Sequence, residues 1–423
     1  MEFKEKRLAN GIRAIAAPMH NTQAVTLLVL IGTGSNYENK RINGISHFLE
    51  HLFFKGTKSR PRVGEVHRAL DGIGAEHNAF TSREHTGYWV KSAVQYADTA
   101  LDVVSDILLE PLFNAAEIER ERGVILQEIS MYEDMPQRRV AEYFEGLLWG
   151  DQPAGWDIAG TPETVKSLTR EDIIGYKTRQ YVANNTVVVI AGNIPPQTAF
   201  RKIETAFAKM PKGRPQQQKK NTRRAQAGKT RFVWKESDQT HLMLGAQACS
   251  MYERARYPLA LLSGILGGNT SSRLFMEIRE RLGLAYYVGA SAQLYTQTGF
   301  LAARAGVPHK ALPAVVRKIT EVLRDVRTRG VNRRELSGIK DYIRGSFALA
   351  FETSDEIASH LGEEGLFRKR IISPNEEVKK LEAVRIEEVN RLAKTLLAPE
   401  RLRLSVVGPH RNTAPYEKLL AAA

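Results

Sequence analysis

The sequence is poor in cysteine and in long apolar runs. Its only cysteine is Cys249, so the chain can form neither an intrachain disulfide nor a cluster of thiolate ligands. Any metal site must therefore use histidines and carboxylates. No apolar run approaches the roughly 20 residues that a membrane-spanning helix needs. The charged start of the chain is followed by no apolar core of a secretory signal, so we expect a cytoplasmic protein that does not contact membranes.

The remaining composition is that of an ordinary globular protein. The 423 residues are 43% hydrophobic and 26% charged, with 32 glycines and 17 prolines. These values exclude collagen-like, low-complexity and wholly disordered chains. At roughly 100–200 residues per domain, the length predicts two to four domains, each large enough to bury a core.

Much of the formal net charge of +14 lies in one segment. Between Pro211 and Gly228 there is no acidic residue, and the basic residues are Lys212, Arg214, Lys219, Lys220, Arg223 and Arg224. The segment has too few large apolar side chains to form a core, so it is predicted to be a linker. An RNA-binding strip is the alternative. Because no aromatic side chains alternate with the charges to stack on bases, we expect no nucleic-acid partner.

The order of expected elements before this linker recurs after it. In the first part we expect strands at 12–17, 24–31 and 186–191, a strand pair within 75–93, and helices at 44–55, 63–70, 96–109, 115–148 and 171–181. In the second part we expect strands at 231–246, 285–291, 299–305 and 402–407, and helices at 258–266 and 272–281. The sequence therefore predicts an α+β fold of two similar domains, at 1–210 and 231–423, joined by a linker at 211–230.

The most informative motif is His47-x-x-Glu50-His51. On a helix, His47 and His51 project from one face, so two neutral imidazoles can share a Zn²⁺ ion. Glu50 lies beside them, where a carboxylate can take a proton from metal-bound water instead of binding the metal. The alternative is an amphipathic helix on which two histidines are four residues apart by chance.

This order, His-x-x-Glu-His, is the inverted zincin signature, and the sequence resembles the pitrilysin family of metallopeptidases. Gly44, Phe54 and Lys55-Gly56-Thr57 match as well. The resemblance covers essentially the whole chain and is strongest to the short-chain branch that includes the mitochondrial processing peptidase. It implies two mainly antiparallel sheets flanked by helices, forming half of a clamshell.

The resemblance also implies the rest of the metal site. A catalytic zinc usually takes three protein ligands, and the family's third is a glutamate that corresponds here to Glu128, 77 positions after His51. Glu121 lies two helical turns earlier and resembles the family's second acid. It would hold a ligand imidazole through its free ring nitrogen, although a solvated glutamate in a surface ion pair is the alternative. One Zn²⁺ per chain is implied.

Three residues of a strand are implied to bind the substrate. Asn78, Ala79 and Phe80 follow a Gly-rich turn and resemble the family's edge strand, to which a peptide adds as a further strand. Backbone pairing of this kind binds varied sequences, because it does not read side chains.

The second half is implied to contribute a substrate clamp and no second zinc. Its matching helix, at 258–264, lacks the His-x-x-Glu-His motif. Arg279 and Tyr286 are similar to the family's Arg and Tyr pair, seven positions apart, which faces the zinc and donates hydrogen bonds to the substrate carbonyl. Without the family pattern both would be surface or packing residues. Tyr287 is the adjacent alternative to Tyr286, and strand alternation would turn it to the opposite face.

These observations together predict a zinc-dependent endopeptidase that hydrolyses peptides or unfolded polypeptides inside a closed cavity. The family implies a homodimer or a heterodimer with a related chain. One alternative is a non-catalytic partner or scaffold subunit, which the intact set of ligand positions argues against. The other is a maturation peptidase dedicated to one small peptide, which would use the same chemistry.

Overall fold

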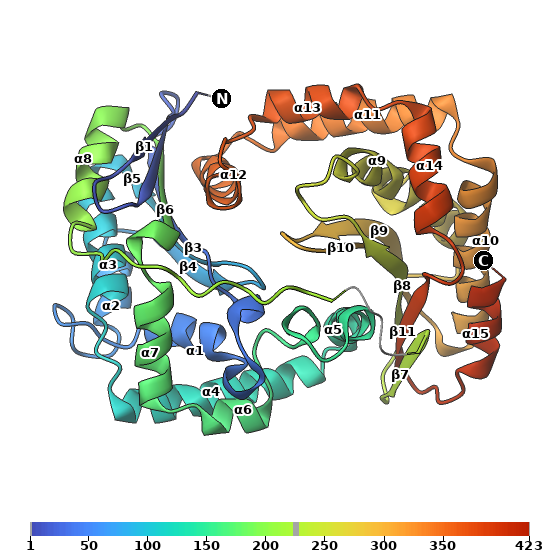
Figure 1. The fold of residues 1–423 in the computed structure, drawn as a ribbon, viewed down its shortest axis with the longest axis horizontal. Helices are drawn as coiled ribbons and strands as arrows, with labels where there is room; N and C mark the ends of the chain where they lie inside the picture. Colours follow the sequence, from blue (N-terminus) through green and yellow to red (C-terminus); the bar gives the residue numbers. More distant parts are fainter. Residues whose placement is uncertain (1, 223–227, 423) are drawn as a thin grey trace. The chain divides into compact units, whose positions relative to one another are not determined.

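The computed structural model describes residues 2–222 and 228–422, which form two compact units. The first unit contains Met1–Ile129, Asp157–Lys219 and Phe347–Pro374, and the second contains Ser130–Trp156, Lys220–Ser346 and Asn375–Ala423. Each unit has one mixed sheet flanked by helices (Figure 1). The predicted α+β fold with two similar domains is confirmed.

The sheet of the first unit has six strands in the order β1-β2-β6-β3-β5-β4. They are β1 Lys4–Arg7, β2 Arg13–Pro18, β3 Ala24–Ile31, β4 Glu76–Thr81, β5 Thr86–Ala93 and β6 Thr186–Gly192. Every neighbouring pair is antiparallel except β2 and β6. Strand β4 therefore forms one edge of this sheet.

The sheet of the second unit repeats this topology. Its five strands lie in the order β7-β11-β8-β10-β9, with β7 and β11 parallel and the other pairs antiparallel. They are β7 Thr230–Trp234, β8 Thr240–Ala248, β9 Tyr287–Leu294, β10 Gly299–Val307 and β11 Arg403–Gly408. Strand for strand, this order matches β2-β6-β3-β5-β4, so the recurrence expected from the sequence is present in the strand pairing.

The helices follow the same repeated order. In the first half of the chain they are α1 Ile45–Leu52, α2 Glu65–Asp71, α3 Ala97–Leu109, α4 Ala115–Glu133, α5 Pro136–Trp149, α6 Pro162–Ser167, α7 Arg170–Gln180 and α8 Pro196–Ala206. In the second half they are α9 Arg256–Gly267, a π-helix Phe275–Arg281, α10 Leu312–Arg329, α11 Arg333–Leu349, α12 Ser354–Phe367, α13 Pro374–Glu382, α14 Ile386–Leu396 and α15 Ala414–Ala421. None of the helices in the described residues is both long and apolar enough to cross a membrane.

Two helices pack on the sheet formed by the other half of the chain. Helix α5, from the first half, packs on β8 and β11, and Phe144 meets Phe300 with ring centroids 5.6 Å apart. Helix α12, from the second half, packs on β3 and β6, where Leu361 joins a core with Leu28. The two halves of the chain thus exchange one helix each. The exchanged helices, α5 and α12, hold equivalent places in the repeated order of elements.

A single helix over 115–148 was expected, and the structure corrects this expectation. Helix α4 ends at Glu133 and α5 begins at Pro136. Proline lacks a backbone N–H and its ring clashes with the preceding turn, so it is tolerated at the start of a helix but not in its interior. The break allows α5 to leave the first unit and join the second.

The sheet of the first unit is covered on both faces. Along β3, Val25, Leu27 and Val29 face a core that includes α1, α3 and α8, while Leu28 and Leu30 face α12. A strand that is buried on both faces has a nearly continuous run of apolar residues, and residues 24–31 form such a run. The expected linker has neither helix nor strand over 211–222, and Arg223 and Arg224 lie outside the described residues.

Candidate metal centre

Helix α1 presents two histidines and a glutamate away from the core. Ile45, Phe48, Leu49 and Leu52 are buried at a helical spacing that forms one apolar face. His47, Glu50 and His51 are left on the other side, each partly exposed. The sequence of this short helix therefore fixes both its attachment to the core and the direction of its three functional side chains.

Glu128 of α4 meets both histidines of α1. Its Oε2 atom lies 3.6 Å from His47 Nε2 and 3.3 Å from His51 Nε2. The imidazole rings are 4.8 Å apart between centroids, at 69° to each other. One ligand atom from each residue lies within 4.8 Å of the others, and this is the only such group of three or more among the described residues.

This donor set fits a zinc ion. Two ligands about 2.1 Å from a tetrahedral metal are roughly 3.4 Å apart, close to the distances between Glu128 Oε2 and the two imidazoles. Two imidazoles and one carboxylate are ligands of catalytic zinc, and three protein ligands leave one position open. His47, His51 and Glu128, predicted as ligands, are thus brought together in the first unit.

Glu121 lies behind His51. The residue is 3% exposed, with Oε2 3.3 Å from His51 Nδ1 and Oε1 2.8 Å from Lys55 Nζ. Burial raises the pKa of Glu121, but the hydrogen bonds from His51 and Lys55 outweigh burial and leave the pKa lowered. An ionised Glu121 can hold the His51 ring with Nε2 directed toward Glu128.

Glu50 is held by a strand rather than by the helix alone. Thr81, the last residue of β4, donates a hydrogen bond of 2.6 Å from Oγ1 to Glu50 Oε2. Burial raises the pKa of Glu50, and the Thr81 hydrogen bond only partly opposes this effect. A carboxyl group with a raised pKa beside a metal site is suited to accept and return a proton.

The charges around His51 favour a proton when no metal is bound. Burial lowers the pKa of His51, but its bonds to Glu121 and Glu128 and the nearby Glu50 raise it to about 9. A site that attracts a proton this strongly also favours a cation, and binding of a metal displaces that proton.

The three predicted substrate-binding residues lie in edge strand β4, which pairs on one side with β5. Asn78 and Phe80 are exposed, and Ala79, between them, is half-buried. Asn78 Oδ1 accepts a 2.9 Å hydrogen bond from the Ala79 backbone N–H. The same strand ends at Thr81, so the edge leads to Glu50.

Arg279 and Tyr286 belong to the second unit. Both are exposed, Tyr286 with 76% of its surface accessible. Arg279 is on the π-helix, and Tyr286 directly precedes β9, where a strand was expected to include it. Tyr287 is engaged instead, because its hydroxyl lies 2.9 Å from His241 Nδ1. The part that Arg279 and Tyr286 play at the metal centre stays a prediction.

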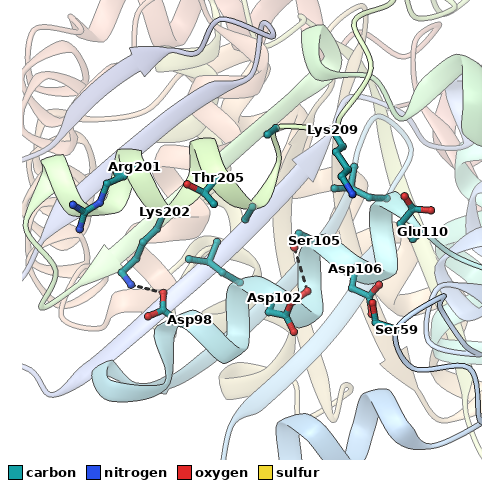
Figure 2. A pocket seen from close by; sticks show the side chains of 14 residues that line it. Ser59, Asp98, Asp102, Ser105, Asp106, Glu110, Arg201, Lys202, Thr205 and Lys209 are labelled. Carbon is teal, nitrogen blue, oxygen red and sulfur yellow. Dashed lines mark hydrogen bonds and ion pairs between the residues drawn. The ribbon is translucent and has the colours of Figure 1, made fainter.

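A groove of about 590 Å³ between α3 and α8 is also present in the first unit (Figure 2). Its acidic side chains already have basic partners: Lys202 pairs with Asp98, and Arg60 pairs with Asp102 and Asp106. No histidine lines the groove, so the metal centre is the stronger candidate for a functional site.

Two contacts of the metal centre were missed from the sequence. Thr81 was expected only as part of a strand, and Lys55 only as part of a matching motif. The side chain of each reaches a carboxylate of the site, Glu50 and Glu121 respectively. Alternation along β4 offered a signal for Thr81, but which element that face meets depends on tertiary packing.

Comparison with known proteins identifies the family of the chain. Residues 13–162 match the insulinase family model (peptidase family M16), and residues 167–343 match that of the M16 inactive domain. The chain is 33% identical to the uncharacterized zinc protease YmxG of Bacillus subtilis, covering 97% of this chain and 99% of that protein. It is also 33% identical to the uncharacterized zinc protease Rv2782c of Mycobacterium tuberculosis, covering 98% and 95%.

Solved structures share the fold. A protease from Helicobacter pylori superposes with a TM-score of 0.87 at 22% identity, covering 96% of this chain and 99% of that one. A putative M16-like peptidase from Alicyclobacillus acidocaldarius superposes with a TM-score of 0.85, also at 22% identity, covering 96% and 98%. With the two family models and the full-length similarity to the named zinc proteases, this places the chain in the insulinase family of peptidases, family M16.

Proposed function

We propose that this chain is a zinc-dependent endopeptidase that hydrolyses peptides or unfolded polypeptides. The observation that carries the proposal is the convergence of His47, His51 and Glu128 on one point, with Glu50 beside them. One Zn²⁺ ion per chain held there would polarise the scissile carbonyl and lower the pKa of the attacking water toward about 7.

Glu50 is the proton carrier in this proposal. It takes the proton of the attacking water and delivers it to the leaving amine. Thr81 directs the Glu50 carboxylate through Oε2, which leaves Oε1 available to the water. Glu121 keeps His51 in the orientation of a ligand.

The peptide is proposed to add to the free edge of β4. Backbone pairing there would align an extended chain along Asn78, Ala79 and Phe80, toward Glu50. The backbone N–H of Ala79 donates a hydrogen bond to Asn78 Oδ1. This bond must break before a peptide can pair with Ala79. This exchange costs little free energy, because the N–H has a hydrogen-bond partner both before and after the peptide binds.

Arg279 and Tyr286 are proposed to donate hydrogen bonds to the substrate carbonyl from the second domain. Their exposure supports this role: Tyr286 is 76% accessible, and Arg279, whose guanidinium lies 5.1 Å from the Phe275 ring centroid, is exposed as well. The proposal assigns catalysis to 1–210 and the clamp to 231–423, closing as half of a clamshell around the substrate. It also includes a homodimer or a heterodimer with a related chain, as in the short-chain branch, and a cytoplasmic location.

One experiment tests the activity directly. Purified protein is incubated with a mixed peptide library, with and without a chelator, and the cuts are mapped by mass spectrometry. We expect cuts at internal bonds that disappear with the chelator and return when zinc is restored. Intact peptides in the presence of stoichiometric zinc would instead support a non-catalytic partner subunit, and cleavage of very few sequences would support a dedicated maturation peptidase.

A further inference from the structure

A buried carboxylate lies at the beginning of the helix that carries the metal ligands. Glu38 is 1% exposed and lies outside α1, six residues before Gly44. Its Oε2 accepts hydrogen bonds from the Gly44 N–H at 2.8 Å and from Asn43 Nδ2 at 2.9 Å. Its Oε1 accepts one from the Ser46 N–H at 2.9 Å. The carboxylate therefore binds the N–H groups of the first turn of α1.

The helix needs this carboxylate because its own cap position cannot supply a side chain. Gly44 is the N-cap, in a left-handed conformation with φ of +98°, and a Cβ there would lie 2.5 Å from the Ala159 carbonyl oxygen. Only glycine fits both constraints. The first N–H groups of a helix lack partners within it, and a side chain at the N-cap normally accepts from one of them. Here that function falls to Glu38.

A second contact holds the same turn. The Ser46 hydroxyl lies 2.9 Å from the hydroxyl of Tyr176, which lies 2.8 Å from Thr33 Oγ1. These contacts fix residue 46, directly before His47. His51 is one turn further on and has its own support from Glu121. The position of His47 therefore depends on the first turn more than that of His51 does.

We propose that Glu38 is a positioning residue of the metal centre, which fixes the first turn of α1 and thereby holds the His47 imidazole at its binding distance from Glu128. A negative charge at the N-terminus of a helix is also favoured by the helix dipole. Burial raises the pKa of Glu38, while the hydrogen bonds from Ser46, Asn43 and Gly44 oppose that effect. The inference rests on the proposed function in one respect, namely that the centre binds a metal.

The test compares Glu38→Gln with Asp106→Asn. Glutamine keeps the size of the side chain but places an amide donor against one of the N–H groups. Asp106 is a matched control, because it is 8% exposed and accepts from Thr57 and Arg60 at 2.6 Å, yet it is on α3 and not beside α1. Zinc affinity is measured by chelator competition, and the visible absorption of the Co²⁺-loaded protein reports the ligand geometry.

We expect Glu38→Gln to weaken zinc binding on the order of tenfold, at the lower end of changes in residues that orient ligands, and to alter the Co²⁺ spectrum. Asp106→Asn should leave both as in the wild type. In a His47→Ala background, Glu38→Gln should lower the affinity no further, since its effect passes through His47. Glu38→Asp, which keeps the charge, should recover part of the loss.

Two results would overturn the proposal. One is an unchanged affinity and Co²⁺ spectrum in folded Glu38→Gln, and the other is an equal effect in Asp106→Asn. If Glu38→Gln fails to fold, Asn43→Ala replaces it, because that change removes one donor to Glu38 and leaves the carboxylate in place. A wild-type spectrum and affinity in Asn43→Ala would then count against the proposal. Failure of the wild-type chain to bind zinc would refute the proposed function instead.

Discussion

Helices α1 and α9 occupy the same place in the two repeated units but have different surroundings. Along the chain, α1 follows β3 and α9 follows β8, and these two strands hold matching places in the two sheets. Opposite α1, helix α4 presents Glu121 and Glu128, whose carboxylates reach the histidines. Opposite α9, helix α11 presents Ile339, and a Cβ on Gly264 of α9 would lie 2.4 Å from its side chain.

The difference shows how few side chains separate a candidate metal centre from an ordinary core in this fold. In the second unit, small residues let the elements approach closely, and a Cβ on Gly267 would lie 2.0 Å from the Ala290 nitrogen. In the first unit, the corresponding space is lined by polar side chains. The repeated topology therefore supplies a helix beside an edge strand, and the side chains decide whether that space can hold an ion.

The strongest test of the comparison is the removal of the proton carrier from α1. Glu50→Gln keeps the side-chain size but cannot accept a proton, so we expect hydrolysis to fall by about 10²–10⁴ with zinc retained near one per chain. Metal analysis and peptide hydrolysis on the same preparation decide it. The exposed Glu387→Gln on α14 is the control and should behave as the wild type. Loss of zinc together with activity would make Glu50 a ligand.

The two carboxylates of α4 should differ in their effect on zinc. Glu121→Gln removes a partner of His51 and should weaken zinc binding by about 10–100-fold. Glu128→Gln removes a ligand and should weaken it more. Both variants are challenged with the same chelator series. Equal zinc occupancy in the two would contradict the assignment of one ligand and one supporting residue.

The second unit is tested by two adjacent tyrosines. Tyr286→Phe should retain zinc and bind peptide but lose about 3 kcal/mol of transition-state stabilisation, because it removes one donor to the oxyanion. Tyr287→Phe should instead cost about 1 kcal/mol of folding stability, since its hydroxyl bonds His241. Hydrolysis rates at equal zinc content and thermal unfolding separate the two effects. A greater loss of rate in Tyr287→Phe would exchange their roles, and no loss in either would leave Arg279 as the one proposed donor from the second unit.

The smallest expected effect concerns the packing of α12 within the first unit. The His85 ring packs edge-to-face against Phe80 and Phe367, and burial lowers the pKa of His85 to about 4. The folded state therefore favours the neutral ring, so this contribution to stability is complete above the unfolded pKa of about 6.5 and falls as the pH drops toward 4. The loss between pH 7 and pH 5.5 should be about 1 kcal/mol. Denaturant unfolding at the two pH values checks it, and His85→Gln should remove that part of the pH dependence.

The sequence was sufficient to single out the candidate metal ligands and insufficient for much that supports them. His47, Glu50 and His51 share a local spacing, and the family pattern added Glu128. Glu38 could not be recognised, because its role depends on a glycine cap whose conformation is set by the approach of residue 159. The contact of Thr81 with Glu50 could not be predicted either, because the pattern of a strand does not show which helix the strand faces.

The exchange of helices was also outside the reach of sequence patterns. The apolar positions of α5 and α12 indicate that each has a buried face, but periodicity does not identify the sheet that covers it. Only Pro136 gave a local sign, because it interrupts the expected helix shortly after the chain passes from the first unit to the second at residues 129–130.

Helix exchange also affects how the protein can be made on a ribosome. The last strand of the first sheet, β6, ends at Gly192, but α12, which covers Leu28 and Leu30, is complete only at Phe367, about 175 residues later. At the usual 5–20 residues per second, one apolar face of that sheet stays uncovered for roughly 10–35 seconds of synthesis. During this interval the nascent chain exposes a surface that chaperones bind, and a truncated product ending before α12 would keep that surface permanently.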